Sequence, residues 1–118
     1  MPLIYKIAPA ALWRQAQDRG RFDGAPADIE DGFIHFSTAA QAEETAAKHF
    51  GGRTDLVLIA VDARRLGDAL RYEASRGGAL FPHLYAPLPL DAVVSVRPLP
   101  PKSGGSHDFA GLLDGPAK

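Results

Sequence analysis

The feature that most constrains the fold is the apolar run from Leu56 to Asp62, in which leucine, valine, isoleucine and alanine fill every position before the aspartate. A strand that is buried on both faces has this composition, because neither face presents polar side chains to water. We therefore expect this segment to be the central strand of a sheet.

Shorter patterns predict the elements around that strand. Residues 3–7 alternate between apolar and polar side chains, as a first strand does. Pro9 suits the first turn of a helix, which we expect to end at Gly20. Further predictions are a surface loop that could act as a lid (21–31), a helical turn (63–67), short strands (70–73 and 92–97), a glycine turn (76–79), and a proline-rich extended or looped segment that is not a central strand (81–89).

These elements predict an α+β domain with a mixed, mostly antiparallel, split sheet of about five or six strands and two principal helices. A chain of 118 residues is long enough for one such domain, which we place at residues 1–99. After Pro98 the composition changes to proline, glycine, serine and charge. We therefore expect residues 100–118 to form a flexible tail that folding does not need and that could dock weakly through the small apolar group at residues 109–113.

Composition narrows the chemistry. The chain has no cysteine, which excludes thiol nucleophiles, disulfides and thiolate metal sites. Its formal net charge of −1 argues against a broad nucleic-acid surface. No signal segment or membrane-spanning run is recognisable, so we expect a cytoplasmic protein that does not enter a membrane. The oligomeric state is not indicated.

Two short segments carry paired polar side chains. In the segment DGFIHFS, strand alternation places Phe33, His35 and Ser37 on one face. In FPHLY, His83 and Tyr85 have the same spacing, and Glu73 ends the nearby segment LRYE. The pattern predicts that the two histidines, Ser37 and Tyr85 line one concave site, with Glu73 as a candidate general base. The alternative is that His35 is a core histidine bonded to the backbone.

Ser37 and Thr38 precede an alanine-rich helix that we expect from Ala39 to about Phe50. Thr38 and Gln41 fit a capping box. The first amides of this helix, with the two hydroxyls, could hold an anion such as pyrophosphate, or could simply be capped.

Two other chemistries compete with this interpretation. His35, His83 and Glu73 form a two-histidine, one-carboxylate set that suits zinc or iron, but no HExxH spacing supports it, and we predict no metal site. Ser37 lies in no GxSxG context, so a serine hydrolase is disfavoured.

The segments IYKI, DGFIHFS, DLVLIAVD, LRYE and FPHLYAPLPLDAV resemble the bacterial family known as domain of unknown function 952, over about residues 3–98. That family is usually grouped by fold with the ADP-ribosyltransferase-like superfamily, which includes RNA 2'-phosphotransferases and uses NAD. The resemblance implies that His35 contacts a ribose of NAD, that His83 or Tyr85 flanks the nicotinamide, and that Glu73 supports the transition state.

The leading expectation is therefore an ADP-ribosyltransferase-like or 2'-phosphotransferase-like enzyme that binds NAD or a related nucleotide. In that interpretation Ser37 and Thr38 hold the pyrophosphate. The alternative is a noncatalytic small-ligand or interaction module on the same fold.

Overall fold

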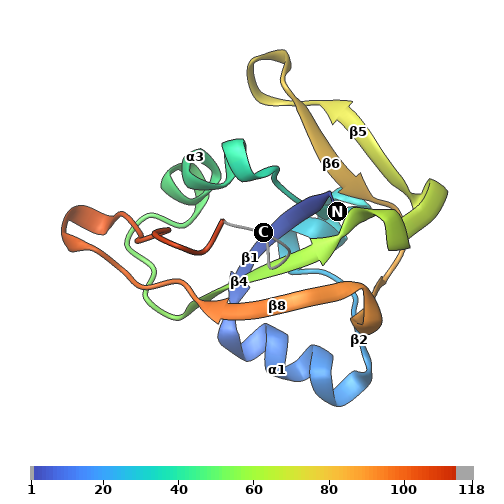
Figure 1. Cartoon of the computed structure of the whole chain (residues 1–118), viewed down its shortest axis with the longest axis horizontal. Helices are drawn as coiled ribbons and strands as arrows, with labels where there is room; N and C mark the ends of the chain where they lie inside the picture. Colours follow the sequence, from blue (N-terminus) through green and yellow to red (C-terminus); the bar gives the residue numbers. More distant parts are fainter. Residues whose placement is uncertain (1, 114–118) are drawn as a thin grey trace.

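A three-stranded antiparallel sheet forms the centre of the molecule (Figure 1). The computed structural model describes residues 2–113. The sheet consists of β1 (Leu3–Pro9), β4 (Leu56–Asp62) and β8 (Val93–Pro98), with β4 in the middle. All of β4 except Val57 is buried, so the prediction of a central, doubly covered strand is confirmed.

Two helices cover opposite faces of this sheet. Helix α1 (Ala10–Arg19) packs on the face that carries Ile4 and Ile59, whereas α3 (Ala39–His49) packs on the face that carries Tyr5 and Leu58. The alternation of side chains along β1 and β4 thus supplies two separate cores. Helix α1 ends at Gly20, whose φ of 89° is left-handed, as expected for a glycine that follows a helix.

A second antiparallel sheet has the strand order β3-β6-β5. Its strands are β3 (Ile34–His35), β5 (Leu70–Ala74) and β6 (Leu80–Leu84), and the hairpin of β5 and β6 projects from the body of the molecule (Figure 1). The prediction that residues 81–89 avoid a central strand is therefore wrong for β6, which lies between its two partners.

Pro82 explains how β6 accepts a proline. The Pro82 carbonyl accepts a hydrogen bond from the Phe36 amide at 3.0 Å, so the backbone of Pro82 faces the β3 side and not β5. Proline has no amide to return this bond. The ladder between β3 and β6 consequently ends at the pair His35 and His83, while the ladder to β5 continues past Pro82.

The predicted lid at 21–31 contains regular structure. Strand β2 (Arg21–Phe22) pairs with β7 (Leu88–Pro89), and α2 (Pro26–Asp31) follows. Pro26 occupies the first turn of α2, and the Ala25 amide donates to Asp28 Oδ2 at 2.8 Å. The loop prediction is therefore wrong for these residues. Four short 3-10 segments complete the description: Ala63–Ala69, Arg76–Gly78, Leu90–Ala92 and Ser103–Gly105.

The two larger sheets meet through one backbone bridge. The amides of Tyr5 and Ser37 each donate to the carbonyl of the other at 2.8 Å. The α+β class and the antiparallel pairing are confirmed, but the strands of residues 2–113 form three small sheets instead of one split sheet of five or six strands. No helix within residues 2–113 is long and apolar enough to cross a membrane.

The segment after β8 packs on the body of the molecule. Leu99 and Phe109 are buried in the core beneath α3, and Leu112 and Leu113 pack against the same cluster. The Nε2 atom of His107 lies 2.8 Å from the Arg53 carbonyl. Spaced apolar side chains thus dock residues 100–113 on the core, and the flexibility of the tail stays a prediction; residues 114–118 lie outside the described residues.

We expect Phe109→Ala to lower the free energy of unfolding by about 3 kcal/mol, because it empties a buried aromatic site. Lys102→Ala, at an exposed position of the same segment, should change it by less than about 0.5 kcal/mol. Urea unfolding of both variants measures this difference. Equal stability of the two variants would mean that the segment contributes no packing energy.

Candidate functional site

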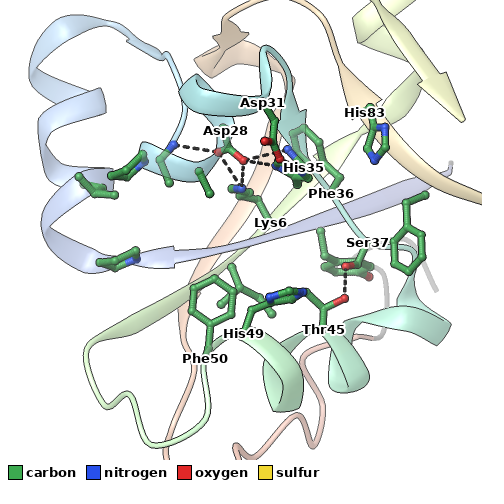
Figure 2. A pocket seen from close by; sticks show the side chains of 18 of the residues that line it. Lys6, Asp28, Asp31, His35, Phe36, Ser37, Thr45, His49, Phe50 and His83 are labelled. Carbon is green, nitrogen blue, oxygen red and sulfur yellow. Dashed lines mark hydrogen bonds and ion pairs between the residues drawn. The ribbon is translucent and has the colours of Figure 1, made fainter. Parts of the chain in front are cut away.

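A cavity of about 560 Å³ opens beside β1. One wall consists of α2 and the end of β3, and the opposite wall consists of the second half of α3. Figure 2 shows the side chains that matter here: Lys6, Asp28, Asp31 and His35 on one wall, Ser37, Thr45, His49 and Phe50 on the other, and His83 to one side.

The cavity exists because β1 is an edge strand that is only partly paired. Its outer edge bonds to Ser37 through Tyr5 alone. Backbone direction alternates along a strand, so the amide and carbonyl of Ile7 face the same side as those of Tyr5. Ile7 and Pro9 line the cavity, which therefore borders a stretch of strand edge that no other strand covers among the described residues.

A buried ion-pair network forms the first wall. Lys6 Nζ lies 2.9 Å from Asp28 Oδ1 and 2.8 Å from Oδ2. His35 Nδ1 lies 2.6 Å from Asp28 Oδ1, and the His35 amide donates to the same oxygen at 3.1 Å. His35 Nε2 is 2.9 Å from Asp31 Oδ2. Each ring nitrogen of His35 thus lies within hydrogen-bond distance of a carboxylate oxygen.

Burial and neighbouring charges shift the pKa values of Asp28 and Lys6 in opposite directions. Burial alone raises the pKa of Asp28, but the hydrogen bond from His35, the Lys6 ammonium and the Ala25 amide outweigh it and hold the pKa at about 2. Burial lowers the pKa of Lys6 below 10.5, and its pairing with Asp28 opposes that shift. The Asp28 side chain is only 2% exposed, so its charge depends on these partners.

A second histidine and carboxylate pair lies on β6 and β5. His83 Nδ1 is 2.8 Å from Glu73 Oε1, and the Tyr85 hydroxyl donates to the same oxygen at 2.7 Å. Phe33 stacks on the His83 ring with centroids 4.1 Å apart, and the Tyr85 ring lies 5.2 Å from Phe33. The bonds from Tyr85 and His83 lower the pKa of Glu73, and the Glu73 bond raises the pKa of Tyr85.

The structure brings together three of the four side chains that the sequence predicts in one site. His35, Ser37 and His83 line the cavity, whereas Tyr85 lines a neighbouring hollow of about 280 Å³ with Phe33. Glu73 stands behind His83, outside the cavity lining.

Ser37 and Thr38 lie at the predicted helix start. The Thr38 amide donates to Gln41 Oε1 at 3.0 Å, which confirms the glutamine half of the capping box. Thr38 does not line the cavity. The Ser37 hydroxyl lies 2.8 Å from Thr45 Oγ1, so it is engaged by a hydroxyl and not by a histidine. This contact gives the serine hydrolase interpretation no support.

The metal interpretation also lacks geometry. Within residues 2–113 no group of three or more His, Cys, Asp or Glu side chains is arranged to hold a metal ion. His35, His83 and Glu73 are therefore not arranged as a three-ligand set in the described part of the chain.

Sequence reasoning missed the residues that complete the first wall. Lys6 carries the one charge within an apolar strand, which was a usable signal for a buried ion pair. Asp28 follows Pro26 at the spacing of a helix start, but its burial depends on contacts distant in sequence. His49 and Arg53 near the end of α3 also line the cavity and carry no recognisable motif.

The family described as "Protein of unknown function (DUF952)" matches residues 7–96, which include every residue of the two histidine pairs. The chain belongs to this DUF952 family. The resemblance to domain of unknown function 952 is thus confirmed, whereas the grouping with the ADP-ribosyltransferase-like superfamily stays a prediction, and the family description assigns no activity.

Solved structures of protein CC0527 from Caulobacter crescentus are similar over nearly the whole chain. A crystal structure is 50% identical, covers 94% of this chain and 97% of its own, and has a TM-score of 0.91. A solution NMR structure of CC0527 is 50% identical, with coverages of 96% and 97% and a TM-score of 0.85. No curated protein matches the chain significantly.

We expect Asp28→Asn to lower the free energy of unfolding by about 3 to 5 kcal/mol, because it leaves the Lys6 charge buried without its partner. Asp31→Asn is the matched control. The Asp31 side chain is 49% exposed and bonds only the outer nitrogen of His35, so we expect a loss below about 1 kcal/mol. Denaturant unfolding at neutral pH compares them, and equal losses would contradict the buried ion pair.

The Asp28 network also predicts acid sensitivity. The pKa of an aspartate carboxyl is ordinarily 3.8, and that of Asp28 is about 2 in the folded protein. Between these values the unfolded chain binds the proton and the folded chain does not, so stability falls as pH falls through this window. Asp28 should contribute about 2 kcal/mol that is present above pH ~5 and lost by pH ~2.

Carboxyl-carbon NMR titration of the folded protein measures the Asp28 pKa directly. A midpoint near the ordinary value would show that the network does not stabilise the charged carboxylate.

Proposed function

We propose that the cavity beside β1 binds a nucleotide, with NAD as the first candidate, and that the protein is an ADP-ribosyltransferase-like or 2'-phosphotransferase-like enzyme. One observation carries the proposal: a nucleotide-sized cavity is lined at one end by a histidine held between carboxylates and at the other by basic side chains of α3 and the loop after it. This separation of acidic and basic side chains to opposite ends of the cavity suits a ligand with a sugar and a charged phosphate group.

His35 and Asp31 are the proposed ribose contacts. A ribose hydroxyl both donates and accepts, so it can insert between His35 Nε2 and Asp31 Oδ2, which are now 2.9 Å apart. Asp31 is half exposed and can move away to admit the sugar. His35 itself is fixed by Asp28 through its other nitrogen.

Arg53 and His49 are the proposed phosphate contacts, together with Ser37, whereas the predicted phosphate role of Thr38 has no support from the cavity lining. Arg53 pairs with Asp55 at 3.4 Å and is half exposed, so its guanidinium can exchange partners at little cost. A phosphate bound to Arg53 forms forked, charge-assisted hydrogen bonds. His83, stacked on Phe33, is the proposed neighbour of the nicotinamide.

The noncatalytic module is the second candidate. It is favoured by one observation: Glu73, the expected transition-state residue, lies behind His83 and does not line the cavity. Nicotinamide release from NAD separates the two candidates, because a binding module binds the ligand without turnover.

We expect NAD and ADP-ribose to raise the melting temperature by several degrees at ~100 times the dissociation constant, which corresponds to about 2.7 kcal/mol. Arg53→Ala should weaken binding about tenfold through the loss of a charged hydrogen bond. Arg14→Ala, which removes an equal charge from exposed α1 outside the cavity lining, should leave the affinity unchanged. Absence of any shift with NAD, ADP-ribose or AMP would rule out the proposal.

A further inference from the structure

We propose that His83 is the proton acceptor of the cavity and that Glu73 is its positioning residue, so that the site activates a hydroxyl group or water as a nucleophile. The identity of the electrophile rests on the proposed nucleotide function. The assignment of His83 rests on geometry alone.

The hydrogen bond to Glu73 fixes the proton on His83. Nδ1 lies 2.8 Å from the Glu73 carboxylate, and a carboxylate only accepts. Nδ1 therefore carries the hydrogen, and in the neutral ring Nε2 keeps a free lone pair. A tautomer fixed in this way is the arrangement that a general base requires.

The other ring nitrogen of His83, Nε2, faces the cavity. Nε2 of His83 has no hydrogen-bond partner among residues 2–113. The only fully buried side-chain nitrogen or oxygen without a partner in that part of the chain is His107 Nδ1, so Nε2 of His83 retains some exposure although the His83 side chain is only 7% exposed. His83 lines the cavity, and its ring points toward the open space in Figure 2.

The surroundings hold the ring in this position. Its side chain is 7% exposed, and Phe33 stacks on it at 4.1 Å with an interplanar angle of 27°. Tyr85 in turn holds Glu73 through the 2.7 Å bond. The dyad is thus fixed before any ligand enters, which limits the reorganisation that a reaction must perform.

A comparison with the neighbouring His35 shows why we assign the role of proton acceptor to His83. His35 is the strand partner of His83 and has a similar carboxylate bond to Asp28, but its Nε2 is occupied by Asp31. Of these two histidines, only His83 presents a free nitrogen to the cavity while the other nitrogen is held. The two rings, 5.6 Å apart, therefore have different roles.

With NAD as the substrate, the proposed reaction is a displacement of nicotinamide at the ribose carbon C1'. The hydroxyl oxygen forms a bond to the C1' carbon of the nicotinamide ribose as the C1'–N bond breaks. Nicotinamide leaves as a neutral molecule with the bonding electron pair. The hydroxyl proton passes to His83 Nε2 and then to solvent.

The first experiment needs no ligand. Long-range proton–nitrogen NMR of the imidazoles should show His83 in the Nδ1–H tautomer, and Glu73→Gln should reduce the population of this tautomer, whereas the exposed control Glu43→Gln should not. An Nε2–H tautomer of His83 would overturn the assignment whether or not NAD binds.

The second experiment tests catalysis by nicotinamide release. His83→Gln should lower kcat about 10²- to 10⁴-fold, with KM changed only a few-fold. Glu73→Gln should lower kcat less, at nearly constant KM, and Glu73→Asp should restore part of it. If NAD binds and turns over equally in the His83→Gln chain, the base assignment fails while the proposed function stands; if NAD does not bind, the proposed function fails and the NMR result still decides the tautomer.

Discussion

The buried carboxylate of Asp28 is the interaction on which the arrangement of the molecule depends. Its two oxygens accept bonds from Lys6 in β1, from the ring and amide of His35 in β3, and from the amide of Ala25 before α2. One side chain thus connects the central sheet, the second sheet and the short helix. Gly24 permits this approach, since a Cβ at that position would lie 2.8 Å from the Asp28 Cβ.

The elements that were predicted correctly from the sequence are those whose formation depends on residues close together in the chain. The apolar run of β4 and the glycine after α1 act within a few residues, and both were predicted correctly. Strand β6 was missed because the tolerance of Pro82 depends on which neighbour its backbone faces. The packing of residues 100–113 was underestimated because Phe109 shares a core cluster with residues distant in sequence, including Leu58 and Ala46.

The candidate site shows the same contrast between features with local causes and features that depend on contacts distant in sequence. His35 and Ser37 both line the cavity, but Phe36 between them lines it too, so period-two spacing alone does not explain the arrangement; the register of β3 with β6 brings His83 beside His35. Spacing alone could not show that Tyr85 turns to a neighbouring hollow or that Glu73 lies behind its histidine. Those positions depend on the hairpin of β5 and β6, which periodicity cannot orient.

His35 and His83 each have a carboxylate at the Nδ1 atom, and the difference between them lies in one exposed residue. Asp31 occupies Nε2 of His35, so that ring has a carboxylate at both nitrogens. His83 has only Glu73 and keeps a lone pair available to accept. The centroids of the two rings lie 5.6 Å apart. Asp31, at the end of α2, therefore distinguishes two otherwise similar histidines. A ligand that displaces Asp31 would change the hydrogen bonding of His35 without disturbing His83.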